Sequence, residues 1–255
     1  MAPPDDPDHP AVTMRVHPDL RFLLPPGRRG GHLSVRAWPT DTVGHVVQDA
    51  GIPLTEVGAL TLNGEPVDPG GRVAPGTLDV DPVLRPQPTP TMPPRFLLDV
   101  HLGTLARRLR LLGLDTTWSP DAGRADDAEL VARAADEDRV LLTQDRRLLH
   151  RRALRFGALV RGHDVADQLD DVLDRFTPPL LPWTRCVACG APLRKVRRAD
   201  VVDLLEPGTL RTYDAFSQCT SCGRAYWRGA HASRLEELVD HARGVVAARL
   251  RAAPP

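Results

Sequence analysis

The chain lacks any run of apolar residues long enough to span a membrane, for which a helix needs about 20. This absence excludes a helical integral membrane protein. The first ten residues, MAPPDDPDHP, are polar and acidic, unlike a signal or transit peptide. No Gly-x-Gly-x-x-Gly follows the first strand expected in the middle of the chain, which disfavours dinucleotide binding. We therefore expect a cytoplasmic protein that binds no dinucleotide.

Net charge is also lacking, because 33 basic and 33 acidic residues cancel, so bulk charge gives no sign of a nucleic-acid partner. The charge is nevertheless uneven along the chain. Arginines crowd the middle third, among them Arg107, Arg108, Arg146 and Arg147. One interpretation is a set of solvated helix faces. The other is a rim that binds the phosphates of RNA around an acidic centre.

Cysteine is scarce, and its four occurrences form two Cys-x-x-Cys-Gly motifs, Cys186 with Cys189 and Cys219 with Cys222. Two such motifs about thirty residues apart are typical of a zinc ribbon, in which four thiolates close a tetrahedral Zn²⁺ site. Because no coordination position stays open, the zinc is expected to be structural. A pair of disulfides is the alternative, and the expected cytoplasmic location disfavours it.

Proline, by contrast, is abundant, with 26 residues that concentrate at the N-terminus, in residues 82–94 and in residues 177–182. Such clusters separate structural units. A length of 255 residues leaves room for two or three domains. We expect a first domain at residues 11–84, a proline-rich linker at 85–94, a middle domain at 95–176 and a third domain at 183–255.

The first domain is expected to have the order β-β-α-β-β, with strands at residues 12–16, 33–36, 57–62 and 77–83 and a helix at 42–50. The Asn63-Gly64 pair predicts a hairpin turn. This order resembles a ubiquitin-like β-grasp domain of the small sulfur-carrier type. The Gly-Gly tail of those carriers is missing, so a sulfur-carrier role is disfavoured. Binding of a partner protein, binding of substrate and simple stabilisation all stay open.

The middle domain alternates short apolar runs with helical patterns. Strands are expected at 95–99, 114–117, 139–143 and 157–160, and helices at 101–112, 127–137, 146–154 and 164–175. This alternation predicts a Rossmann-type α/β domain with a parallel sheet and helices on both faces. The third domain is expected to have ribbon strands at 193–196, 201–205 and 210–216, and a closing helix at 233–250. Tyr226 and Trp227 either pack on the ribbon or stack on bases.

Acidic residues follow two of the expected strands. Asp99 and Asp145 each come at a carboxyl end, where functional groups gather in open parallel sheets. A third acid comes from the run DDAEL at residues 126–130. Clustered carboxylates need a cation, and Mg²⁺ or Mn²⁺ prefers such oxygen ligands. The hydroxyl of Thr143 would orient Asp145 or the attacking water. The alternative for each acid is that it caps the helix that follows it.

The runs FLLDVHLGTLARRLRLLGLDTTW and DDAELVARAADEDRVLLTQDRRLL resemble the Mut-seven C-terminal ribonuclease family, a branch of the PIN-like nucleases. By position, Asp99, Asp127 and Asp145 match the acidic residues of that family, and Asp164 is a fourth candidate ligand. A β-grasp domain before and a zinc ribbon after occur together in bacterial members, so the resemblance spans nearly the whole chain. It implies a PIN-like nuclease domain flanked by these two modules.

The resemblance implies a metal-dependent ribonuclease that hydrolyses phosphodiester bonds with carboxylate-bound Mg²⁺ or Mn²⁺. RNA is the expected partner, and a protein partner of the β-grasp domain is possible. Thr104 and Gln144 depart from the family, which usually has basic residues there, and this puts the affinity for substrate in doubt. An RNA-binding regulator without catalysis is therefore the second hypothesis, and a sulfur-transfer accessory protein is the third. The oligomeric state stays open.

Overall fold

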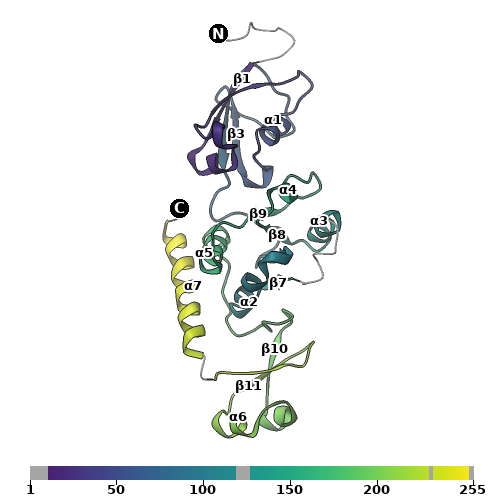
Figure 1. Ribbon diagram of the computed structural model, residues 1–255, viewed down its shortest axis with the longest axis vertical. Helices are drawn as coiled ribbons and strands as arrows, with labels where there is room; N and C mark the ends of the chain where they lie inside the picture. Colours follow the sequence, from purple (N-terminus) through teal and green to yellow (C-terminus); the bar gives the residue numbers. More distant parts are fainter. Residues whose placement is uncertain (1–10, 119–126, 230–231, 253–255) are drawn as a thin grey trace. The chain divides into compact units, whose positions relative to one another are not determined.

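The computed structural model describes residues 11–118, 127–229 and 232–252. Asp126 and the polar first ten residues lie outside this part of the chain. The chain divides into two compact units. The first unit consists of residues 1–84 together with 145–159, and the second of residues 85–144 together with 160–255. Figure 1 colours these segments along the sequence, from purple through teal and green to yellow.

The first unit is built on a five-stranded sheet in the order β2-β1-β5-β3-β4. Its strands are β1 (Ala11–Val16), β2 (His32–Arg36), β3 (Val57–Leu62), β4 (Glu65–Pro66) and β5 (Gly76–Pro82). The central pair, β1 and β5, is parallel, whereas β1 with β2 and β3 with β5 are antiparallel. With helix α1 (Val43–Asp49), this is the ubiquitin-like β-grasp arrangement expected from the sequence.

Local sequence explains the ends of these elements. The Thr42 hydroxyl accepts a hydrogen bond from the N–H of His45 and so caps α1. Asn63 and Gly64 have φ angles of 55° and 87°, as the predicted hairpin turn between β3 and β4 requires. Among its described residues the domain also contains the 3-10 helices η1 (Pro18–Leu23), η2 (Pro26–Arg28) and η3 (Leu54–Glu56).

Residues 145–159 belong to the first unit and contain α4 (Arg146–Leu149) and β9 (Gly157–Leu159). The helix predicted at 146–154 was wrong in its length. The chain leaves the helix after Leu149 and turns, which brings the side chains of Leu149 and Leu154 together over Gly157. A Cβ at Gly157 would lie 2.8 Å from Leu154 Cδ2 and 3.0 Å from Leu149 Cδ2.

The second unit contains the parallel sheet that the sequence predicts. Strand β6 (Arg95–Leu98) pairs in parallel with β7 (Asp115–Thr117) on one side and with β8 (Val140–Thr143) on the other. All four residues of β8 are buried, as are Phe96, Leu97 and Leu98, because helices cover this sheet. The main helices are α2 (Gly103–Leu111), α3 (Asp127–Asp136) and α5 (Val165–Phe176). A 3-10 turn, η4 (Val100–Leu102), comes directly before α2.

The C-terminal part of this unit is a three-stranded antiparallel ribbon of β10 (Leu193–Val196), β11 (Phe216–Cys219) and β12 (Ala225–Trp227). The strand predicted at 201–205 was wrong, because those residues lie in the 3-10 helix η6 (Arg198–Leu204). The Asp200 carboxylate accepts a hydrogen bond from the N–H of Arg197, which starts this turn. The strand predicted at 210–216 was wrong except at Phe216, because residues 210–212 end α6 (Pro207–Thr212), which begins at a proline, and residues 213–215 are irregular.

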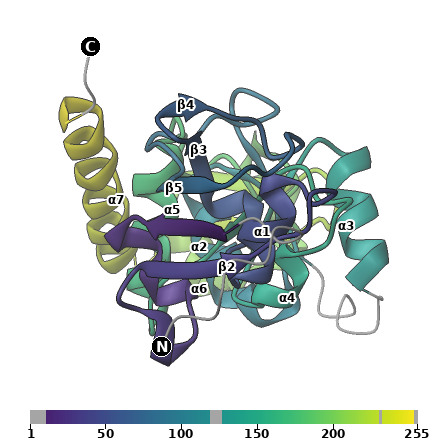
Figure 2. The ribbon, with the colours of Figure 1, turned by 90° about the horizontal axis from the view of Figure 1, so that it is seen from above.

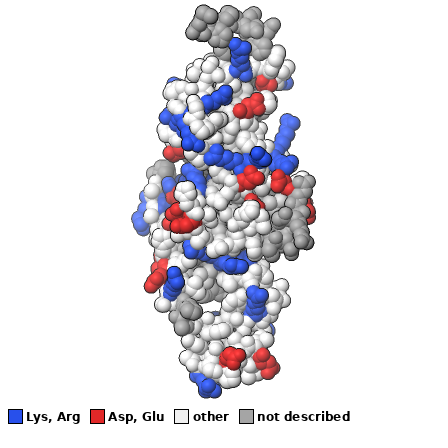
Figure 3. Space-filling model, in the orientation of Figure 1, with Lys and Arg blue, Asp and Glu red and all other residues white. Residues whose placement is uncertain are grey.

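The closing helix predicted at 233–250 is confirmed as α7 (Ala232–Ala252), and it packs alongside α5 (Figures 1 and 2). No helix within the described residues is both long and apolar enough to cross a membrane. On the face drawn in Figure 3, basic and acidic side chains are intermixed, in keeping with the zero net charge.

Candidate functional site

The candidate site lies at the carboxyl ends of β6 and β8. Asp99 follows β6 directly, and its N–H donates to the carbonyl of Leu142 in β8 (3.0 Å). Its half-buried carboxylate is held at both oxygens. Oδ1 accepts from the N–H of Val100 (2.6 Å), and Oδ2 accepts from the hydroxyl of Thr143 (2.8 Å). The structure thus brings Thr143, which is fully buried, onto Asp99.

Trp118, which was not predicted from the sequence as a site residue, supports the turn that follows Asp99. The indole Nε1–H donates to the carbonyl of Val100 (3.0 Å). The six-membered ring packs on Gly103, where an added Cβ would lie 2.5 Å from Trp118 Cζ2. A glycine at the first position of α2 therefore makes room for the indole. The signal in the sequence was a glycine at a helix start, where a residue with better helix propensity is usual.

The remaining predicted acids occupy helix starts. Asp127 is the first residue of α3 and is half-buried. Asp164 caps α5, where its carboxylate accepts from the N–H groups of Ala166 (2.7 Å) and Asp167 (3.0 Å). Backbone hydrogen bonds from Asp167 and Ala166 hold the pKa of Asp164 below its usual range. Within the described part of the second unit, Asp99, Asp127 and Asp164 form no close cluster of ligand atoms.

Asp145 belongs to the first unit and caps α4, since its carboxylate accepts from the N–H of Arg147 (2.8 Å). Asp99 likewise caps η4. The capping role that the sequence left open is thus present at Asp99 and Asp145, and Asp164 caps a helix as well. It does not exclude a metal role, because each carboxylate oxygen has more than one lone pair.

The predicted RNA-binding arginines differ in their surroundings. The side chains of Arg107 and Arg147 are exposed, and that of Arg108 is half-buried. Arg146 donates to two backbone carbonyls of the β-grasp domain, those of Leu23 and Phe22 (both 3.2 Å).

Thr104 and Gln144, where the resemblance led us to expect basic residues, also have different surroundings. Thr104 is exposed. The side-chain amide of Gln144 donates to the carbonyls of Val160 (3.4 Å) and Gly162 (3.2 Å). Gln144 therefore has a structural role at the end of β8.

The four cysteines of the ribbon form a cluster whose sulfur atoms all lie within 4.8 Å of one another. Cys186 and Cys222 are 3.7 Å apart, and Cys189 and Cys219 are 3.4 Å apart. Zn–S bonds of about 2.3 Å in a tetrahedron place sulfur atoms about 3.8 Å apart, so the donor set and its spacing fit Zn²⁺. The same distances exclude disulfides among the cysteines, which are all free.

The electrostatics of the cluster are uneven. Burial raises the pKa of Cys186, but hydrogen bonds with the Tyr226 hydroxyl and with the N–H groups of Cys189 and Ala188 outweigh it and lower the pKa to about 6. Burial raises the pKa of Cys189 to about 12. The Tyr226 hydroxyl lies 3.0 Å from Cys186 Sγ, so Tyr226 packs at the cluster.

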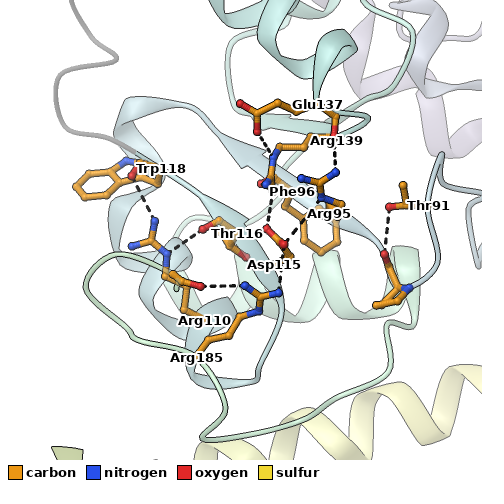
Figure 4. A network of polar contacts seen from close by, with 12 residues as sticks. Thr91, Arg95, Phe96, Arg110, Asp115, Thr116, Trp118, Glu137, Arg139 and Arg185 are labelled. Atoms are coloured by element: carbon orange, nitrogen blue, oxygen red, sulfur yellow. Dashed lines mark hydrogen bonds and ion pairs between the residues drawn. The ribbon is translucent and has the colours of Figure 1, made fainter. Parts of the chain in front are cut away.

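A buried arginine joins this cluster to the α/β domain. Arg110 of α2 is 1% exposed. It donates to the carbonyl of Ala188 (2.6 Å) between the first two cysteines. It also donates to the carbonyls of Thr116 (2.9 Å) and Trp118 (3.3 Å), as Figure 4 shows. A Cβ at Gly190 would lie 2.9 Å from the Thr116 carbonyl and 3.1 Å from Arg110 Nε, which explains the glycine after the motif.

A second polar network surrounds Asp115 at the start of β7 (Figure 4). Its carboxylate accepts from Arg139 (2.6 Å) and Arg185 (3.1 Å), and Arg95 lies 3.9 Å away. Burial alone would raise the pKa of Asp115, but the Arg139 hydrogen bond and the three positive charges outweigh burial and lower the pKa. This network ties β6, β7, β8 and the ribbon together at the amino ends of the strands.

The fold and the cysteine cluster define a class of protein in which a β-grasp domain precedes a parallel α/β domain that carries a zinc ribbon. Two family models match within the chain. One, described as Mut7-C RNAse domain, matches residues 94–239, and the other, described as Mut7-C ubiquitin, matches residues 9–87. The chain belongs to the Mut7-C RNAse domain family, which confirms the resemblance found in the sequence. Searches of curated proteins and of solved structures gave no match.

Proposed function

We propose that the protein is a metal-dependent ribonuclease in which Asp99, Asp127 and Asp145 hold Mg²⁺ or Mn²⁺, with Asp164 as a further candidate ligand. Membership of the Mut7-C RNAse domain family supports hydrolysis of RNA. The single observation that carries the proposal is the hydrogen bond between Thr143 and Asp99 (2.8 Å), which joins the carboxyl ends of two parallel strands.

The donor chemistry at Asp99 suits a hard cation, because its ligand atoms are carboxylate oxygens. When bound, Mg²⁺ or Mn²⁺ supplies an activated water and neutralises the charge that develops on a phosphodiester. The side chains of this protein supply the positioning. Thr143 and the N–H of Val100 fix the two oxygens of Asp99, which leaves the remaining lone pairs in a defined direction.

The RNA backbone is expected to meet arginines, and we propose Arg107, Arg108, Arg146 and Arg147 for this role. The four cysteines would hold a structural Zn²⁺. The cytoplasmic location, a protein partner for the β-grasp domain, and the domain limits 11–84, 95–176 and 183–255 stay predictions from the sequence.

Cleavage of single-stranded RNA in the presence of Mn²⁺ tests the proposal. We expect Asp99→Asn and Asp145→Asn each to reduce the rate by more than about 100-fold, since loss of an outer partner of a metal ligand alone costs about 10- to 100-fold. Asp136→Asn, at the exposed far end of α3, is the matched control and should retain activity. Equal rates for the wild type and both variants would contradict the proposal.

The second candidate function is RNA binding without catalysis. Two observations favour it: Asp99 and Asp145 already cap helices, and Gln144 holds the backbone where the family usually has a basic residue. A wild type that binds RNA tightly but cleaves none with Mg²⁺ or Mn²⁺ would establish this function in place of the first.

A further inference from the structure

Residues 145–159, called here the Asp145 segment, form one compact unit with the β-grasp domain, although residues 85–144 separate the two in the sequence. We propose that the β-grasp domain acts within its own chain, as a support that holds the Asp145 segment in place. In this role it is a positioning domain for Asp145, and that part of the inference rests on the nuclease function proposed above.

The strongest contact is a buried one. Glu56, at the end of η3, is 0% exposed, and its carboxyl Oε1 accepts a hydrogen bond from the N–H of Leu159 (2.8 Å). A carboxyl group is costly to bury and is retained only where it has partners. The N–H of Leu159 in β9 therefore has a side chain of the β-grasp domain as its acceptor.

The other end of the segment is held by Arg146, directly after Asp145. Its guanidinium donates to the carbonyls of Leu23 and Phe22 at the end of η1, and it lies 5.6 Å from the centre of the Phe22 ring. A planar group that spans two carbonyls and also contacts an aromatic ring has little freedom to rotate. This arrangement fixes the first turn of α4, on which the orientation of Asp145 depends.

Two further contacts lie between these ends. The half-buried ring of His150 hydrogen-bonds the backbone of Gly51, which follows α1. Gly157 packs on η3, where an added Cβ would lie 3.3 Å from Thr55 Cγ2. Three separate parts of the β-grasp domain thus contact one segment of 15 residues, all through side chains or glycines of specific type.

These contacts assign the β-grasp domain a role within its own chain. The sequence alone had left partner binding, substrate binding and stabilisation open for this domain. A β-grasp domain that served only a partner protein would have no need of a buried carboxyl aimed at a backbone N–H of the Asp145 segment. The contacts favour an intramolecular support.

Hydrogen exchange of the full-length protein, measured by segment without metal or RNA, tests the support directly. We expect Glu56→Ala and Arg146→Met to speed exchange in residues 146–159 by about tenfold or more, while β1 and β5 keep their protection. Glu56→Gln retains an acceptor oxygen and should behave as the wild type. Arg152→Ala removes the same charge from an exposed position of the segment and is the matched control.

RNA cleavage by the Glu56 variants tests the positioning of Asp145. We expect the Mn²⁺ concentration for half-maximal cleavage to rise about tenfold in Glu56→Ala and to return to the wild-type value in Glu56→Gln. Unchanged exchange in residues 146–159 would overturn the inference, and so would faster exchange with an unchanged Mn²⁺ requirement. A wild type that cleaves no RNA, with exchange altered as expected, would refute the nuclease function and leave the internal support standing.

Discussion

At the scale of single residues, the carboxylate of Asp99 is defined by what holds it. One oxygen is bound by a backbone N–H and the other by the hydroxyl of Thr143, a side chain with no exposure to solvent. A hydrogen bond to a charged group contributes about 1.5–3 kcal/mol, and more is lost when one partner stays behind unsatisfied. The buried hydroxyl of Thr143 thus fixes the orientation of the Asp99 carboxylate.

Thr143→Val removes this hydroxyl and keeps the shape of the side chain. We expect the variant to lose about 10-fold in the rate of RNA cleavage, because Asp99 then has a freer orientation. Thr143→Ser keeps the hydroxyl and should recover most of the rate. Measurement of kcat and of the Mn²⁺ requirement distinguishes a lost orientation from a destabilised protein, and equal rates for Val and Ser would refute the role.

Asp115 makes a prediction about pH. Its pKa in the folded protein is lowered, so the stability that its charge contributes is present above the unfolded-chain value of about 3.9 and is lost as the pH falls through the lower folded value. Asp115→Asn should lower the midpoint of thermal unfolding by roughly 5 °C at pH 7. The difference from the wild type should shrink towards pH 3. Asp203→Asn, an exposed acid in η6, should show no such pH dependence.

At the scale of elements, the sequence predicts most of the strands and helices, because hydrophobic period and capping residues are local signals. Strand β3 and strand β10 agree residue for residue with the prediction. The failures lie where short-range contacts accompany a turn. Helix α4 ends at Leu149, and the side chains of Leu149 and Leu154 then both lie against Gly157. Residues 201–204 form a 3-10 helix, at whose start Asp200 accepts a hydrogen bond from the N–H of Arg197. The cysteine cluster was predictable from spacing alone. The roles of Arg110 and Trp118 were not, because their side chains bond backbone carbonyls, which carry no sequence signal, and the carbonyl of Ala188 lies 78 residues beyond Arg110.

Two glycines in helices show how packing overrides propensity. Ala at either position should gain up to about 1 kcal/mol of helix propensity. At Gly244 of α7 no atom lies within 4 Å of an added Cβ, so Gly244→Ala should stabilise the protein by roughly that amount. At Gly103 the Cβ meets the Trp118 ring, so Gly103→Ala should destabilise by about 1–3 kcal/mol. Chemical denaturation of both variants measures the free energy of unfolding, which should rise in Gly244→Ala and fall in Gly103→Ala. A stabilised Gly103→Ala would contradict the packing described at Trp118.

At the scale of the whole molecule, Arg110 links the cysteine cluster to the α/β domain. Its guanidinium donates hydrogen bonds to the carbonyl of Ala188 in the cluster and to those of Thr116 and Trp118 in the α/β domain. Removal of Zn²⁺ by a chelator from the reduced protein should therefore lower the unfolding midpoint by at least about 5 °C. Hydrogen exchange should quicken in residues 108–118 as well as in the ribbon itself. Addition of Zn²⁺ should reverse both changes. Faster exchange confined to residues 183–229 would show that Arg110 does not couple the cysteine cluster to the α/β domain.

The chain leaves one compact unit for the other at Gln144–Asp145 and returns at Leu159–Val160. No single cut in the gene can therefore separate the two units intact. A recombinant fragment that starts at residue 94 keeps the buried leucines Leu148, Leu149 and Leu154 but lacks residues 11–84 of their compact unit, and such a fragment should aggregate when expressed.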